Sequence, residues 1–239
     1  MAIHNNPVAI VTGAGSGIGR ATAKLLSEAG YSVVVVGRRL EAIEETSMML
    51  STPGIGVAVD ITDPDAQREI VGSTIERFGR LDVLINNAGS APLAAIDKST
   101  PELIEDAFAV NAVAPAKLIA AAWPTMVAQK RGCIVNVSTM GTQDPFAGFF
   151  AYAAAKSAVN VMAKSCAKEG RAHGIRAFSV APGAVETAML RGNFPESRLP
   201  KSACLAPEQI AQLIVDCVQG VHDARNGDTL FISAQTGLR

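Results

Sequence analysis

The stretch PVAIVTGAGSGIGR, residues 7–20, joins a strand pattern, a glycine-rich turn and the start of a helix with no linker between them. Glycines at positions 13, 17 and 19 permit a tight turn and a close approach of the backbone to a diphosphate, and the following helix N-terminus offers unpaired N–H groups. The spacing differs from the G-x-G-x-x-G fingerprint, because position 18 is Ile. We expect this turn to bind a dinucleotide diphosphate through Gly13, Ser16, Gly17, Ile18 and Gly19.

Apolar runs and helical patterns alternate along the rest of the chain. The strand candidates are 7–13, 32–37, 56–61, 81–89, 132–138, 176–183 and 227–233, and the helical segments are 17–29, 40–50, 64–79, 101–131, 151–173 and 207–220. Strands that are apolar on both faces and are separated by helices are typical of a covered parallel sheet. We therefore expect an α/β fold with a doubly wound parallel sheet of about seven strands and helices on both faces. Residues 1–239 are expected to form a single domain, with an irregular lid at about 184–206 that contains no helix.

The composition excludes several classes of partner. The formal net charge is -1 and the basic residues form no cluster, so neither nucleic acid nor a membrane surface is an expected partner. The four cysteines show no CxxC spacing, and the three histidines are far apart in the sequence, so no metal site is expected. The chain has no apolar run long enough to span a bilayer and no leader pattern at its start, and we expect a cytoplasmic protein.

The end of the second strand candidate reads VVVVGRR, residues 33–39. In dinucleotide-binding folds an acidic residue at this place binds the adenosine ribose, whereas an arginine accommodates a 2′-phosphate. Here Gly37 supplies no carboxylate, and Arg38 and Arg39 supply guanidinium groups that suit phosphate oxygens. NADP(H) is therefore favoured over NAD(H), although both arginines could instead be solvated residues at the start of a helix.

One of the two tyrosines of the chain, Tyr152, stands four residues before Lys156 in an alanine-rich helical pattern. This spacing places the two side chains one turn apart on the same helix face. An ammonium group beside a phenol lowers the phenol pKa, which prepares a tyrosine for proton exchange with an alcohol or a carbonyl. Alone, the pair is weak, since the spacing also arises by chance.

Taken together, the motifs of the chain resemble those of the short-chain dehydrogenase/reductase family over nearly its whole length. The matching pieces stand in the order of the family: TGAGSGIG (12–19), DIT (60–62), NNAG (86–89), Asn111, VNVST (135–139), YAAAK (152–156) and APGAVET (181–187). The resemblance implies a Rossmann-type domain that transfers a hydride between a nicotinamide and a carbonyl or alcohol. It also implies a homodimer or homotetramer.

The resemblance implies roles for individual residues. Tyr152 would be the general acid or base, Lys156 would lower its pKa and bind the nicotinamide ribose, and Asn111 would hold a water in the proton relay. The remaining cofactor contacts that it implies are Asp60 and Ile61 at the adenine, Asn87, Ala88 and Gly89 at the ribose and diphosphate, and Pro182, Gly183, Val185 and Thr187 at the carboxamide.

The position of the catalytic hydroxyl stays open at this stage. The family places a hydroxyl residue thirteen positions before the tyrosine, and that residue donates a hydrogen bond to the substrate oxygen. An ungapped match selects Thr139, whereas one inserted residue in the following loop would select Ser138. We favour Thr139, because that match needs no insertion.

The segments that should border the substrate are rich in apolar side chains. Met140, Phe146, Phe149, Phe150, Met189, Leu190 and Phe194 would form an apolar wall, although Phe149 and Phe150 could equally lie in the core or at a subunit contact. Arg191 and Arg198 could meet a carboxylate or phosphate of the substrate. We expect an NADP(H)-dependent oxidoreductase for a small apolar carbonyl compound or secondary alcohol. The alternatives are a 3-oxoacyl-thioester reductase acting on an acyl carrier protein and a catalytically silent nucleotide-sensing protein.

Overall fold

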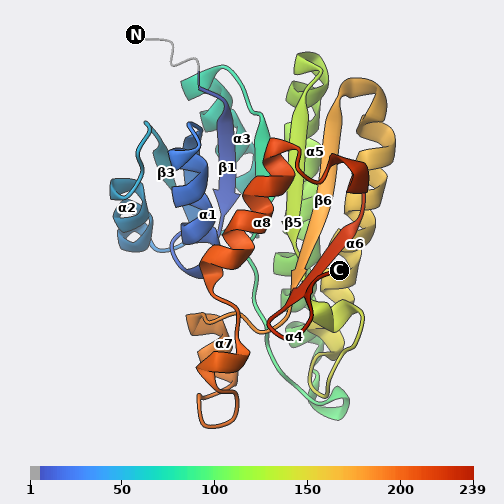
Figure 1. The fold of residues 1–239 in the computed structure, drawn as a ribbon. Coiled ribbons are helices and arrows are strands. Elements are labelled where there is room, and N and C mark those ends of the chain that lie inside the picture. The colour runs from blue at the N-terminus through green and yellow to red at the C-terminus, as the bar shows by residue number, and fades with distance from the viewer. Residues whose placement is uncertain (1–5) are drawn as a thin grey trace.

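A computed structural model describes residues 6–239, and its centre is one open sheet (Figure 1). The strand order is β3-β2-β1-β4-β5-β6-β7-β8, and all neighbours are parallel except β7 and β8. The strands are β1 (Val8–Thr12), β2 (Ser32–Gly37), β3 (Ile55–Ala58), β4 (Val83–Asn86), β5 (Gly132–Val137), β6 (Ile175–Pro182), β7 (Thr229–Ser233) and β8 (Gly237–Leu238). The expected doubly wound α/β sheet is confirmed.

Helices cover both faces of this sheet. They are α1 (Gly17–Glu28), α2 (Leu40–Met48), α3 (Ala66–Phe78), α4 (Pro101–Phe108), α5 (Ala114–Gln129), α6 (Phe150–Gly170), α7 (Ala188–Asn193) and α8 (Pro207–Gln219). Helices α1, α2 and α8 contribute to the core on one face, and α3, α5 and α6 contribute to the core on the other. In Figure 1, α1 and α8 lie in front of the strands, and the strands point toward α7.

The strand register brings the β-branched residues of neighbouring strands side by side in buried rows. Val35 pairs with Val11, Val11 with Ile85, Ile85 with Val135, and Val135 with Phe178, so that one continuous row crosses five strands. All five side chains are fully buried. Since the row runs beneath the helices of one face, each strand must be apolar there, and the alternate residues meet the helices of the other face.

Three local features differ from the sequence-based expectations. The sheet has an eighth strand, β8, which pairs antiparallel with β7 and returns the end of the chain to the sheet edge. The segment expected as one helix over 101–131 is divided by a π-helical turn at Ala109–Val113. The stretch 184–206 is not wholly irregular, because it contains α7 and a 3₁₀ turn at Lys201–Ala203.

Helix α7 forms despite the nearby prolines because both of its ends have partners. The Thr187 hydroxyl accepts a hydrogen bond from the Leu190 N–H at 3.2 Å, which caps the first turn. Arg191 forms an ion pair with Glu186 and donates to the Leu199 carbonyl at 2.7 Å. A side-chain cap and an ion pair leave no periodic pattern of apolar residues, so the sequence did not predict this helix.

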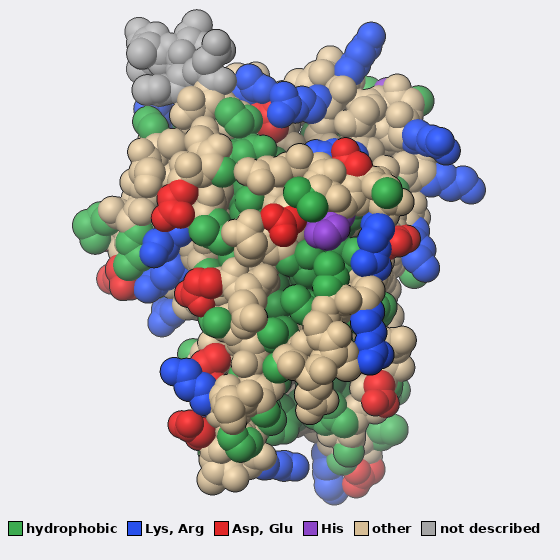
Figure 2. All heavy atoms as spheres, in the orientation of Figure 1, with side chains coloured by type: hydrophobic (Ala, Val, Ile, Leu, Met, Phe, Trp, Pro, Cys, Tyr) green, Lys and Arg blue, Asp and Glu red, His purple; other side chains and the backbone are tan. Residues whose placement is uncertain are grey.

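The surface in the orientation of Figure 1 has a mixed character. Hydrophobic side chains gather in the middle of this face between α8 and β7, and charged side chains lie mostly around them (Figure 2). Within residues 6–239, the helices are too short or too polar to cross a lipid bilayer.

Candidate active site

A cavity of about 1090 Å³ opens where the parallel strands end. Every expected catalytic or cofactor-binding residue lines this cavity except Gly19 and Asn111. Carboxyl ends of strands are where open α/β sheets bind ligands, because the loops there diverge to opposite faces. The cavity is larger than a typical drug-sized pocket, so its volume suits a dinucleotide together with a small substrate.

The glycine turn leaves no space for side chains on its inner surface. Gly13 has φ +65°, and a Cβ atom there would lie 2.9 Å from the Ala88 Cα. A Cβ atom on Gly19 would lie 2.3 Å from the Gly13 carbonyl oxygen and 2.5 Å from the Asn87 Nδ2. Gly19 therefore acts behind the turn, where it permits close packing, and this explains why it does not reach the cavity.

The start of α1 is open toward the same cavity. Ser16 is the N-cap residue, but its side chain makes no capping hydrogen bond. The first N–H groups of the helix and the Ser16 hydroxyl therefore remain available to a ligand, and the helix dipole favours an anion there. The turn, its missing side chains and the uncapped helix fit the diphosphate of a dinucleotide.

Two residues that the sequence analysis missed hold the back of this turn. The Thr46 hydroxyl donates to the Ala14 carbonyl at 3.0 Å, and the Arg20 guanidinium donates to the Gly15 carbonyl at 2.6 Å. Arg20 is itself held by an ion pair with Glu45 at 2.7 Å. These hydrogen bonds give the Ala14 and Gly15 carbonyls partners outside the turn and fix its backbone. Thr46 reaches the turn only because the fold packs α2 beside it, so the sequence carries no local signal for that contact. Arg20, by contrast, lies only five residues after Gly15.

The NNAG motif is tied to the end of β1. The Thr12 hydroxyl accepts hydrogen bonds from the Asn87 and Ala88 N–H groups, each at 3.0 Å. The Asn87 side chain donates to the Thr12 carbonyl at 2.8 Å. These bonds fix the cavity wall beside the glycine turn, so the Asn87 amide supports the backbone there.

Arg38 and Arg39 lie at the end of β2 and line the cavity. The Arg38 side chain is 77% exposed, and its Nη1 lies 3.6 Å from the Asp60 carboxylate. Burial raises the pKa of Asp60, but hydrogen bonds from Thr62 and the Arg38 charge together hold it below its usual value. Asp60 is therefore ionised at neutral pH. The Arg38 guanidinium has five N–H donors, and this one long, mostly exposed ion pair leaves most of them free for a further anionic group.

Tyr152 and Thr139 line the same cavity. Helix α6 begins at Phe150, which places Tyr152 in its first turn, and Thr139 follows directly after β5. Burial raises the pKa of Tyr152 to about 12, although the Thr139 side chain offsets part of this rise. Ser138 points elsewhere, because its hydroxyl donates to the Lys156 carbonyl at 3.3 Å. Of the two candidate hydroxyl residues, only Thr139 affects the pKa of the tyrosine.

Lys156 is 4% exposed and its Nζ donates to the Val137 carbonyl at 2.8 Å. Burial lowers the pKa of Lys156 to about 8. The sequence predicted that this lysine would lower the pKa of Tyr152. In the structure the ammonium group is directed to the end of β5, and burial dominates the tyrosine pKa, so the expected lowering is not found.

Asn111 lies in the π-helical turn between α4 and α5 and is fully buried. Its Nδ2 donates to the Ser90 carbonyl at 2.9 Å and to the Ala107 carbonyl at 2.8 Å, and its Oδ1 accepts from the Ser90 N–H at 3.3 Å. The side chain therefore serves backbone groups that the irregular helix and the loop after β4 leave unpaired. It lies behind Gly89, where a Cβ atom would come within 2.7 Å of the Asn111 Oδ1.

Most, but not all, of the expected apolar wall lines the cavity. Met140, Phe146, Phe149, Met189, Leu190 and Phe194 do so, whereas Phe150 does not and is 49% exposed. Arg198 lines the cavity, but Arg191 does not, because Glu186 and the Leu199 carbonyl hold its guanidinium within the segment 184–206. Phe150 begins α6 and faces outward, while Phe149 and Tyr152 pack together on its inner side.

Comparison with known proteins assigns this constellation to a family. The sequence model of the short-chain dehydrogenases matches residues 7–198. The chain belongs to the short-chain dehydrogenase family. Members of this family are oxidoreductases that use a nicotinamide cofactor. An uncharacterized oxidoreductase of Staphylococcus epidermidis is 33% identical over 192 residues, which cover 80% of this chain and 84% of that protein.

Solved structures of short-chain dehydrogenases superpose over almost the whole chain. A short-chain dehydrogenase/reductase family protein matches with a TM-score of 0.87 and 30% identity, covering 98% of both chains. A variant of actinorhodin polyketide ketoreductase, crystallised with NADPH, matches with a TM-score of 0.91 and 26% identity, covering 99% of both chains.

Proposed function

We propose that this short-chain dehydrogenase is an NADP(H)-dependent oxidoreductase that interconverts a carbonyl group and a secondary alcohol on a small apolar substrate. The observation that carries the proposal is that the Tyr152 and Thr139 side chains line one cavity together with the glycine turn. A dinucleotide-binding site alone would be compatible with a catalytically silent nucleotide-sensing protein. The presence of Tyr152 and Thr139 beside that site favours an enzyme.

The two hydroxyls have complementary tasks in this proposal. In reduction, Tyr152 donates its proton to the carbonyl oxygen, and Thr139 donates a hydrogen bond to the same oxygen as negative charge develops there. In oxidation, Tyr152 accepts the proton of the alcohol. A bound nicotinamide cofactor supplies or accepts the hydride. Lys156 would bind the nicotinamide ribose hydroxyls, and its positive charge would then favour proton loss from Tyr152.

The cofactor preference rests on Arg38. Arg38 lines the cavity, and its guanidinium has N–H donors that are free to bind a 2′-phosphate. Gly37 supplies no carboxylate for a ribose 2′-hydroxyl. The NADPH-bound ketoreductase of similar fold supports the same preference. Arg39 is the N-cap residue of α2 and can approach the same phosphate.

Three further assignments belong to the proposal. The chain forms a single catalytic domain in which residues 184–206 cover the substrate. It assembles as a homodimer or homotetramer, since Val113 and Val161 are 46% and 61% exposed on the helical layer. It acts in the cytoplasm. The acyl-carrier alternative is less favoured, because Arg191 is held inside the lid and is not free to contact an acidic carrier helix.

A carbonyl screen tests the proposal. Purified protein is mixed with NADPH and a panel of aryl, alkyl and cyclic ketones, and loss of the reduced cofactor is followed by absorbance. We expect turnover of at least one apolar ketone, and a Tyr152→Phe variant that binds NADPH but has lost nearly all turnover. Equal turnover in Tyr152→Phe, or activity confined to carrier-bound thioesters, would contradict the proposal.

A further inference from the structure

Four aromatic rings form a continuous row along the substrate side of the cavity. The Tyr152 and Phe149 ring centroids are 5.1 Å apart, those of Phe149 and Phe146 are 3.7 Å apart, and those of Phe146 and Phe194 are 5.7 Å apart. All four residues line the cavity. The row therefore runs from the proton-transfer tyrosine on α6 to the lid segment that follows α7.

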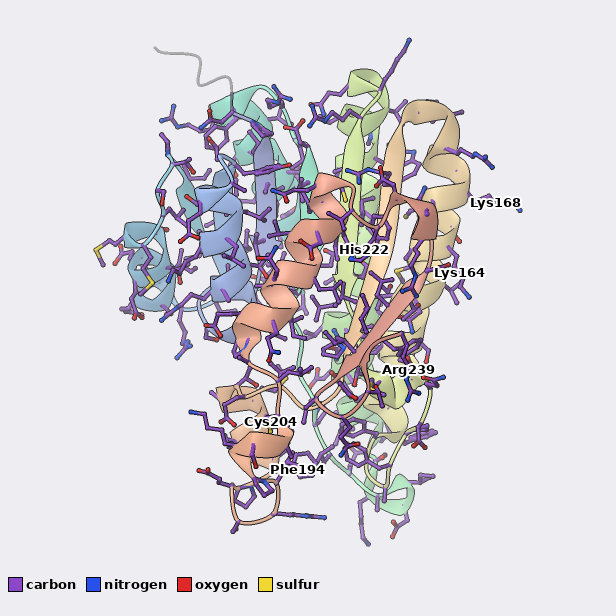
Figure 3. All side chains as sticks on the ribbon, viewed as in Figure 1. Lys164, Lys168, Phe194, Cys204, His222 and Arg239 are labelled. Atoms are coloured by element: carbon purple, nitrogen blue, oxygen red, sulfur yellow. The ribbon has the colours of Figure 1, made fainter. Side chains whose placement is uncertain are left out.

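The far end of this row carries a cation. The Arg198 guanidinium lies over the Phe194 ring, 5.6 Å from its centroid, and Arg198 lines the same cavity. Figure 3 places Phe194 in the segment of α7, at the end of the molecule to which the strands point. The four successive separations bound the distance from the Tyr152 ring to the Arg198 guanidinium at about 20 Å.

Arg198 differs from the other cations of the cavity. Arg38 and Arg39 lie beyond the glycine turn at the end of β2, and Lys156 is buried beside the catalytic pair. Within residues 6–239, no ion pair neutralises Arg198, whereas Arg191 in the same lid is paired with Glu186. An arginine that rests on an aromatic face with its fork free is suited to bind a carboxylate or phosphate.

We infer that the substrate is an elongated apolar ketone or alcohol with an anionic oxygen group at the end opposite the reacting carbon, and that Arg198 binds this group. This inference rests on the proposed function and narrows its substrate class. The aromatic row contacts the apolar body of the substrate, and the two polar ends meet Tyr152 and Arg198. Asp144 also lines the cavity. The competing prediction is therefore a substrate with a cationic end, which would pair with Asp144 instead of Arg198.

A matched series of ketones tests the inference. Acetophenones carry a para alkyl chain of increasing length that ends in a carboxylate, in its methyl ester or in a primary amine. For the wild type we expect kcat/KM to favour the acid over the ester, with a ratio that grows with chain length to about fivefold, which corresponds to about 1 kcal/mol. Arg198→Gln should bring this ratio close to one. Lys201→Gln removes a lid cation that does not line the cavity, and should leave the ratio unchanged.

The outcomes separate the inference from the proposed function. Equal kcat/KM for acids and esters, an unchanged ratio in Arg198→Gln, or a preference for the amines would overturn the inference while leaving a carbonyl reductase in place. If no ketone is turned over with either cofactor, the proposed function fails. Calorimetric binding of the same compounds then still tests Arg198: preferential binding of the acids that is lost in Arg198→Gln supports the anion site, and equal binding of acids and esters contradicts it.

Discussion

Replacing Thr139 and Ser138 one at a time distinguishes a hydroxyl that takes part in catalysis from one that supports the backbone. Thr139→Ala removes a hydroxyl that lines the cavity with Tyr152 and accepts from the Gly141 N–H at 3.2 Å. Loss of one donor to a developing oxyanion typically lowers kcat by about 10²- to 10³-fold. Because the Thr139 side chain lowers the pKa of Tyr152, its loss raises that pKa, which further opposes proton transfer in the oxidative direction.

Ser138→Ala is the matched control. It removes a buried hydroxyl that donates to the Lys156 carbonyl at 3.3 Å, so about 1 kcal/mol of stability and little turnover should be lost. Both variants lose one buried hydroxyl, and their melting temperatures should therefore fall by similar amounts. Thr139→Ser keeps the hydroxyl and should retain most activity.

The assay is the initial rate of NADPH oxidation with the best ketone of the screen, at saturating cofactor and with melting temperatures measured in parallel. A large loss of turnover in Ser138→Ala together with a nearly active Thr139→Ala would refute the reasoning and move the role to Ser138. Equal losses in both variants would indicate that backbone support at the end of β5 dominates.

Three further predictions concern the surroundings of the site. Lys156 has a folded pKa of about 8, below its usual value, so between pH 8 and 10.5 the unfolded chain binds more protons and folding is favoured as pH rises. Chemical unfolding across this range should show the wild type gaining stability relative to Lys156→Met, by at most about 3 kcal/mol, and parallel pH profiles would contradict this. Asn111→Ala leaves the Ser90 N–H and carbonyl unpaired, and should cost about 2 kcal/mol in the free energy of unfolding, or about 4–8 °C in Tm; an unchanged Tm would show that water replaces the amide. Gly19→Ala forces a Cβ against backbone and should abolish cofactor binding in a calorimetric titration, whereas Gly72→Ala, which meets nothing within 4 Å, should bind the cofactor normally; normal binding by both variants would count against the close-packing argument.

The architecture and the outline of the site could be predicted because they depend on local patterns. The β-branched runs and the glycine turn next to them read directly as a parallel sheet with a phosphate cradle. The cavity then brought together residues separated by more than 170 positions, such as Gly13 and Thr187, because the strand ends converge on one edge. Asn111 stood out in the sequence as a polar residue in an apolar helix, and the structure gives it backbone partners.

Features that depend on individual side-chain contacts, rather than on a strand or helix period, could not be predicted from the sequence. Helix α7 depends on the Glu186–Arg191 ion pair and on the Thr187 cap within a stretch that is interrupted by prolines. The Thr46 contact with the glycine turn exists only because α2 packs beside it, and Glu45 of α2 holds Arg20 there. Sequence spacing correctly placed Lys156 near Tyr152, but it did not reveal that the Val137 carbonyl would hold its ammonium group.

The central claim is that this short-chain dehydrogenase binds NADP(H) through Arg38, and a fluorescence titration with NADPH and with NADH tests it most directly. A charge-assisted phosphate contact is worth about 1.5–3 kcal/mol, so the wild type should bind NADPH at least about tenfold more tightly than NADH. In Arg38→Asp, which replaces the guanidinium by a carboxylate, that preference should disappear or reverse. Failure to bind either cofactor, or an undiminished preference for NADPH in Arg38→Asp, would contradict the account.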